Sequence, residues 1–115
     1  MRSFIRRTRE AERLALATRL AQAQADADRI VAYLIARLDP PRIYRWGSLL
    51  RPETFQAISD IDIALEGVAD TADFGRAVEE CRRMTTLPLD ILRIEDVHPL
   101  YRAEIIDRGE VVYER

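Results

Sequence analysis

Three aspartates lie at positions where aspartate is unusual. Asp60 and Asp62 alternate with isoleucines in an apolar segment, and Asp90 is flanked by leucine and isoleucine in another. Aspartate is depleted in β-strands, so carboxylates inside apolar strands indicate a functional requirement. Side chains two positions apart on one strand share a face at a separation of about 6–7 Å, and carboxylates that close repel unless a cation lies between them. Oxygen ligands of this kind suit Mg²⁺ or Mn²⁺, so we expect all three aspartates to bind divalent metal.

A Gly47-Ser48 pair upstream of the first aspartates offers a binding site for phosphate. Glycine lets the backbone approach a phosphate without obstruction from a Cβ atom, and the serine hydroxyl and amide can donate hydrogen bonds to it. Arg51 is near enough in sequence to reach the same phosphates. All 18 basic residues are arginine, which excludes the phosphate-binding lysine of a P-loop and leaves this role to arginine.

Metal held by carboxylates beside a phosphate site would support an in-line phosphoryl displacement. Asp90 is then the natural general base, or the ligand that orients the attacking hydroxyl. Each motif alone is common, and Asp60 by itself is equally consistent with a helix cap or a turn. The ordered combination of strand, Gly-Ser turn, Asp-x-Asp strand, helix and third Asp-containing strand is much more specific.

The elements that would position these residues follow from periodicity and from helix breakers. Apolar residues spaced by threes, fours and sevens, without Pro or Gly, predict one long helix over residues 8–38, ended by Asp39-Pro40-Pro41. Further along, the patterns predict strands over 42–46, 60–66 and 87–94, helices over 70–84 and 99–109, and a short edge strand over 111–113. This order predicts one α/β or α+β domain over residues 1–115, in which 1–38 form the N-terminal helical part and 42–114 a catalytic core built on a small mixed sheet flanked by helices.

The long N-terminal helix has two parts of different character. We expect residues Ile30–Leu38 to pack on the sheet of the same domain, because their apolar stripe is the stronger one. A helix of this length overhangs a small domain, so we expect the part over Leu14–Ala27 to contact a partner.

Composition excludes several classes of protein. With 115 residues, a net charge of −2 and a pI near 5.5, the chain gives no electrostatic basis for direct binding of nucleic acid. The single cysteine, Cys81, rules out an intrachain disulfide and is expected to be a buried hydrophobe. We expect Trp46 in the core and His98 in a turn. No segment reads as a signal peptide or reaches transmembrane length, so we expect a cytoplasmic protein without a membrane partner.

The combined pattern resembles a known family. Trp46-Gly47-Ser48 followed by Ser59-Asp60-Ile61-Asp62-Ile63 is similar to the Gly-Ser…Asp-x-Asp signature of the DNA polymerase β-like nucleotidyltransferases. Within that superfamily the chain resembles the minimal nucleotidyltransferases encoded beside a HEPN-domain partner, through its third-carboxylate strand over 87–92 and its closing helix over 99–109. The similarity covers about residues 30–114. The loop departs from the family pattern, since Pro52 follows Arg51 where a second glycine is frequent.

The resemblance implies a fold and an activity. It implies the polymerase β-like nucleotidyltransferase fold, with ATP as substrate and its phosphates bound at Gly47, Ser48, Arg51 and Ser59. Such proteins are antitoxins that transfer AMP from ATP to a tyrosine of a HEPN ribonuclease toxin and so silence it. Three alternatives remain open: an antitoxin that acts by complex formation alone, a nucleotidyltransferase that modifies a small molecule or RNA, and a helical interaction protein with incidental aspartates.

Overall fold

The computed structural model describes residues 2–47 and 60–115, with side chains from Arg6 onward in the first helix. Within these residues the elements are α1 (Arg2–Leu38), β1 (Arg42–Arg45), β2 (Ile61–Glu66), α2 (Ala72–Arg82), β3 (Leu89–Arg93), the short 3-10 helix η3 (Ile94–Asp96), α3 (Pro99–Arg108) and β4 (Glu110–Glu114). The predicted class, a mixed α+β fold with a long N-terminal helix, is confirmed. Helix α1 begins earlier than predicted, because no Pro or Gly interrupts it from Arg2 onward.

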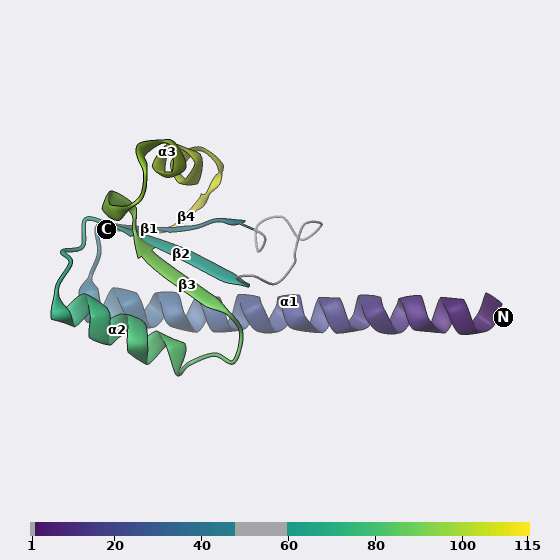
Figure 1. Cartoon of the computed structure of the whole chain (residues 1–115). Coiled ribbons are helices and arrows are strands. Elements are labelled where there is room, and N and C mark those ends of the chain that lie inside the picture. The colour runs from purple at the N-terminus through teal and green to yellow at the C-terminus, as the bar shows by residue number, and fades with distance from the viewer. Residues whose placement is uncertain (1, 48–59) are drawn as a thin grey trace.

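The four strands form one mixed sheet in the order β3-β2-β1-β4. Strand β1 pairs antiparallel with both β2 and β4, whereas β2 and β3 are parallel. Parallel neighbours need a crossover connection, and α2 supplies it on the same side of the sheet as α1 (Figure 1).

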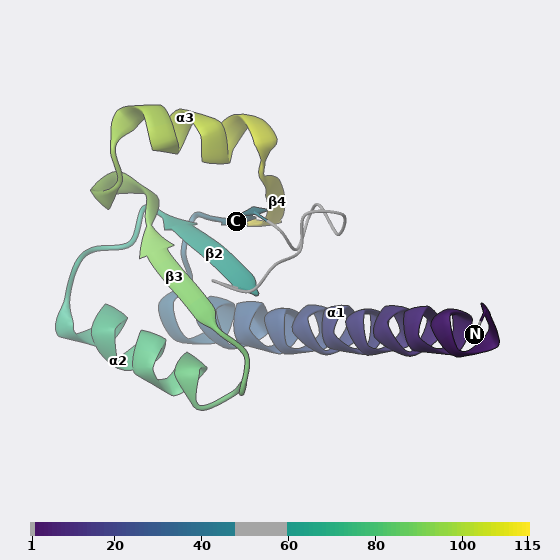
Figure 2. The ribbon, with the colours of Figure 1, turned by 45° about the vertical axis from the view of Figure 1, so that its right-hand side comes forward.

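The sheet carries helices on both faces, as Figure 2 shows. Alternate residues of the strands, among them Ile43, Ile61 and Ile63, are buried against α1 and α2. The residues between them point to the opposite face, where Tyr44 and Ala64 pack with Ile105 of α3. The period of two in the strands therefore sorts side chains into two separate cores, one on each side of the sheet.

Helix α1 packs on the sheet only through its second half. Ala23, Ala27, Ile30 and Leu34 are fully buried in the domain's own core. The prediction that a partner covers Leu14–Ala27 is therefore wrong from Ala23 onward, because the spacing of these residues brings them to the same helix face as the predicted core stripe.

Polar contacts fasten the same half of α1 to the rest of the domain. Asp26 accepts a hydrogen bond of 2.7 Å from the Thr85 hydroxyl in the loop before β3, and it also contacts Arg29. On β1, the buried Arg45 donates to the side-chain oxygen Oε1 of Gln24 at 2.7 Å, and burial lowers the pKa of its guanidinium. These contacts fix the rotation of α1 about its own axis.

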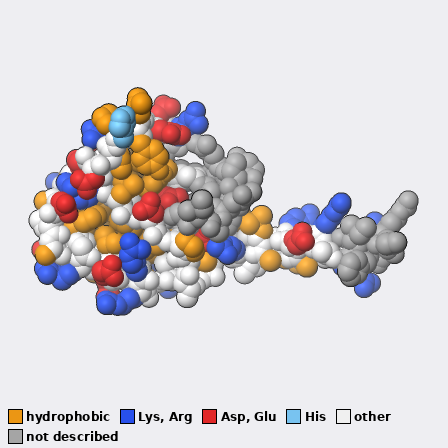
Figure 3. All heavy atoms as spheres, in the orientation of Figure 1, with side chains coloured by type: hydrophobic (Ala, Val, Ile, Leu, Met, Phe, Trp, Pro, Cys, Tyr) orange, Lys and Arg blue, Asp and Glu red, His pale blue; other side chains and the backbone are white. Residues whose placement is uncertain are grey.

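The first half of α1 projects beyond the domain. Every side chain over residues 6–18 is exposed, and Figure 3 shows this segment as an arm extending from the body. The 37 residues of the helix span about 55 Å at 1.5 Å per residue, which accounts for the 58 Å long axis of the molecule. None of the described helices combines the length and apolarity that a membrane crossing requires.

Helices α2 and α3 begin at side-chain caps. Thr71 accepts a hydrogen bond from the Phe74 amide at the start of α2. His98 caps α3, because its Nδ1 accepts from the Leu100 amide at 3.1 Å. The predicted turn role of His98 is thus confirmed.

Candidate active site

Asp62 and Asp90 lie side by side on neighbouring strands. They are register partners in the parallel β2–β3 ladder, where paired Cα atoms are about 4.8 Å apart. Both side chains lie on the α3 side of the sheet, since the alternate positions Ile61 and Ile63 are buried against α1 and α2. Asp62 is buried and Asp90 is exposed, so the pair forms a carboxylate site that opens to solvent at Asp90.

Asp60 departs from the predicted alternation. It lies just before β2, where its own amide and that of Ile61 both donate to the Pro88 carbonyl oxygen, at 3.0 and 3.2 Å. The regular ladder therefore starts only at Ile61. The Asp60 carboxylate contacts Arg19 of α1, whose Nε and Nη2 lie 2.7 and 2.5 Å from Oδ2. The sequence predicted Asp60 inside the strand beside Asp62, whereas the structure places it just before the strand and paired with Arg19.

The second oxygen of Asp60 has no such donor. The residue is fully buried, and no described residue donates a hydrogen bond to Oδ1. A buried polar atom without a partner costs about 1–3 kcal/mol, and more where the group is charged. A bound cation is the kind of ligand that offsets this cost.

The three aspartates do not form one closed cluster. Within residues 2–47 and 60–115, no group of three or more His, Cys, Asp or Glu side chains is arranged to hold a metal ion. The donors nevertheless suit a hard dication, because they are carboxylate oxygens alone: the adjacent pair Asp62 and Asp90, and the unpartnered Oδ1 of Asp60. The structure thus brings two of the predicted ligands into register and places the third at the start of the same strand.

Gly47 lies directly against the Asp62 carboxylate. Its φ of +79° is in the left-handed region, and a Cβ atom there would lie 2.5 Å from Asp62 Oδ2. The Trp46 amide donates to the Asp62 carbonyl oxygen at 3.4 Å, which holds the two segments together. Only glycine combines an unstrained positive φ with this close approach to Asp62. The other predicted phosphate ligands, Ser48, Arg51 and Ser59, lie outside the described residues.

A small cavity of about 220 Å³ borders Gly47 on the α3 side. Trp46 is buried as predicted, and its indole Nε1 donates to the Tyr101 hydroxyl at 3.1 Å, with the two rings edge to face. Glu104 and Arg108 line the rest of the cavity. Aromatic and charged groups therefore adjoin the glycine turn.

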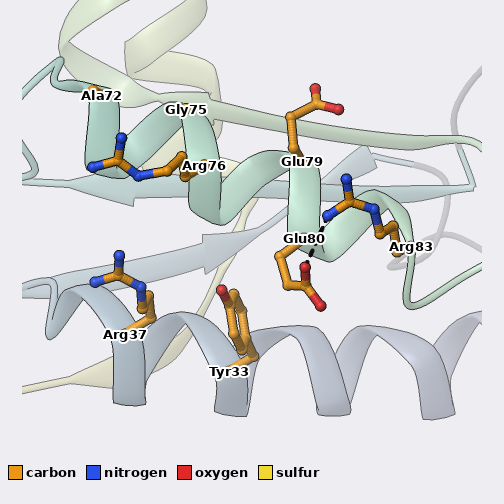
Figure 4. A pocket seen from close by; sticks show the side chains of 8 residues that line it. All are labelled: Tyr33, Arg37, Ala72, Gly75, Arg76, Glu79, Glu80 and Arg83. Carbon is orange, nitrogen blue, oxygen red and sulfur yellow. Dashed lines mark hydrogen bonds and ion pairs between the residues drawn. The ribbon is translucent and has the colours of Figure 1, made fainter.

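A larger hollow of about 880 Å³ lies between α1 and α2, as Figure 4 shows. Its lining consists of Tyr33, Arg37, Ala72, Gly75, Arg76, Glu79, Glu80 and Arg83. Each of its three arginines forms an ion pair with a carboxylate of α2. Because α1 and α2 cover the sheet face opposite to Asp62 and Asp90, this hollow is separate from the carboxylate site.

Cys81 takes no part in either site. It is fully buried in α2, as predicted, and burial raises the pKa of its thiol to about 12, with a smaller contribution from Glu80. A thiol in this state is not a nucleophile near neutral pH.

Sequence reasoning missed two residues: Arg19, which contacts Asp60, and Tyr101, which lines the cavity beside Gly47. Arg19 is one of many arginines on an exposed helix, and its partner Asp60 is 41 positions away. Tyr101 lies at an exposed position of α3 and carries no periodic signal. Only the tertiary fold brings either residue to the site.

Comparisons of the chain with protein-family models, with curated proteins and with solved structures find no match.

Proposed function

We propose that this protein is a nucleotidyltransferase that transfers AMP from ATP to a tyrosine of a HEPN ribonuclease toxin and thereby neutralises it in the cytoplasm. The observation that carries the proposal is the in-register pair of Asp62 and Asp90, with the Gly47 turn against Asp62. The resemblance of the Gly-Ser and Asp-x-Asp motifs to minimal nucleotidyltransferases supplies the acceptor class.

In this proposal the carboxylates hold Mg²⁺ or Mn²⁺. Asp62, Asp90 and the unpartnered Oδ1 of Asp60 are its ligands. The dication, when bound, neutralises the negative charge of the triphosphate. Gly47 has no Cβ, so its backbone lies directly against the Asp62 carboxylate, and a phosphate at this turn would lie beside the metal ligands.

The transfer itself exchanges one P–O bond for another. The acceptor hydroxyl oxygen attacks the α-phosphorus of ATP, and the bond from that phosphorus to pyrophosphate breaks. The hydroxyl proton passes to the Asp90 carboxylate, which is the exposed member of the pair and is therefore reachable by an acceptor from outside. A protein acceptor fits this arrangement, because Asp90 is exposed at the surface of the described domain.

The proposal is tested by incubating the protein with a purified HEPN partner, Mg²⁺ and ATP labelled at the α-phosphate. We expect label on the partner, and we expect Asp62→Asn and Asp90→Asn to reduce the transfer at least about 10³-fold while the far-ultraviolet circular dichroism stays unchanged.

Asp70→Asn is the matched control, since Asp70 is an exposed aspartate in the loop before α2. Normal transfer by the Asp62→Asn variant would show that the site is assigned wrongly. Label on RNA or an aminoglycoside, with no partner protein present, would instead point to a different acceptor.

A second function, neutralisation by complex formation alone, is favoured by the projecting part of α1. Leu14 and Leu16 there are 67% and 41% exposed, although they are large apolar residues. Removal of residues 2–17 would then abolish toxin neutralisation, while Asp62→Asn would leave it intact. The reverse pattern would reject this second function.

A further inference from the structure

Arg19 lies at the point where α1 meets the domain. The side chains over residues 6–18 are exposed, Arg19 and Leu20 are half-buried, and Ala23 is fully buried. From this position the guanidinium reaches the loop end of β2 and forms two contacts, of 2.7 and 2.5 Å, to Oδ2 of Asp60. Helix α1 therefore contacts the candidate active site through the Arg19 side chain.

The Arg19 guanidinium contacts only one of the two carboxylate oxygens of Asp60 among the contacts described. Oδ2 receives the charge-assisted hydrogen bond from Arg19, whereas Oδ1 is buried and receives no hydrogen bond from residues 2–47 or 60–115. The two oxygens are chemically equivalent, so the contact does not select one of them, but it holds the plane of the carboxylate because the planar guanidinium donates to one oxygen in a defined direction. Arg19 thus limits rotation about the Cβ–Cγ bond and leaves the other oxygen of Asp60 available to another ligand.

We propose that Arg19 is a positioning residue for metal binding: it anchors one oxygen of Asp60 so that the other binds the dication. This inference rests on the proposed function, because it assumes that the aspartates bind metal. It adds that the N-terminal helix is part of the metal site. The carboxylate is fully buried, so the contact acts where water screens charge least.

A purely structural role for Arg19 makes a different prediction. The Arg19 side chain is 41% exposed, but the Asp60 carboxylate is fully buried, so loss of the contact would leave a buried carboxylate without its cationic partner. Loss of the contact would then lower the free energy of unfolding and leave metal affinity unchanged. Metal affinity, measured without ATP or acceptor, separates the two roles.

The test measures Mn²⁺ binding to the full chain by electron paramagnetic resonance, which reports free aqueous Mn²⁺. We expect Arg19→Met to weaken Mn²⁺ binding about tenfold, as removal of a residue that orients a metal ligand does elsewhere. Arg19→Lys keeps the charge but loses the planar donors, so we expect a smaller loss of about threefold. Arg13→Met is the matched control: it removes the same charge from an exposed position of the same helix, and its affinity should equal that of the wild type.

The outcomes separate this inference from the proposed function. If Asp62→Asn leaves Mn²⁺ binding unchanged, the proposed function fails and the inference fails with it. If Asp62→Asn weakens binding but Arg19→Met leaves it unchanged or tightens it, only the inference is overturned. If Arg19→Met does not fold, Arg19→Lys decides the question by the same comparison.

Discussion

At the scale of single residues, the contact between Gly47 and Asp62 leaves no room for a side chain. We expect Gly47→Ala to reduce AMP transfer about 10²-fold, because the new methyl group displaces the Asp62 carboxylate by about an ångström. The positive φ adds about 1–3 kcal/mol of strain, which a urea titration will show as lower stability.

Gly75→Ala provides the control for that substitution. Gly75 is in α2, and no atom lies within 4 Å of a Cβ placed there. We expect this variant to be about 0.5–1 kcal/mol more stable than the wild type, with normal transfer. Equal transfer activity of the Gly47→Ala and Gly75→Ala variants would show that Gly47 is not part of the site.

The Cys81 thiol permits a prediction about reactivity and pH. Its raised pKa of about 12, against an ordinary value of 9.0, keeps it protonated and unreactive in the folded chain. We expect Ellman's reagent at pH 8 to label it no faster than the protein unfolds, and at once in 8 M urea, a concentration of roughly the order that unfolds small domains. The shift also stabilises the fold below pH 9, and this contribution is lost as the pH rises toward 12. Rapid labelling of the folded protein would contradict the buried position of Cys81.

At the scale of elements, helix α1 offers a matched pair of leucines. Leu34 is fully buried and Leu14 is 67% exposed, although both are in the same helix. We expect Leu34→Ala to lower the free energy of unfolding by about 2–5 kcal/mol, because it leaves a cavity in the core. Leu14→Ala should change it by less than about 0.5 kcal/mol. Similar losses in both variants would mean that the outer half of α1 also packs on the domain.

The same scale shows what periodicity can and cannot predict. Alternation of polar and apolar residues was sufficient to predict strands carrying Asp62 and Asp90, because burial of one sheet face determines that pattern. It could not predict the position of Asp60, since the pairing with Arg19 joins residues 41 positions apart. The length of α1 that packs on the domain was underestimated for a related reason. Alanine is a good helix former whether or not it is buried, so Ala23 and Ala27 carry little signal.

At the scale of the whole molecule, the domain and the projecting segment are separable. Removal of residues 2–17 deletes exposed helix and keeps Arg19 with its contact to Asp60. We expect the free energy of unfolding of the shortened chain to lie within about 0.5 kcal/mol of the wild-type value, since few buried contacts are lost. Its hydrodynamic radius should fall, and its Mn²⁺ affinity should stay unchanged. A cooperative loss of structure on truncation would contradict this separation.

The parallel pairing of β2 with β3 determines when the carboxylate pair forms during synthesis and folding. Asp62 and Asp90 become neighbours only when these two strands pair in this register. The chain must first form the crossover connection through α2, which lies between the two strands in sequence. A slip of one residue would turn the Asp90 side chain into the apolar layer and bring a neighbouring hydrophobic side chain to its place. A ribosome-bound chain that has not yet released β3 therefore holds Asp62 without Asp90 and lacks the proposed carboxylate site. The proposed transfer can begin only after β3 has paired with β2.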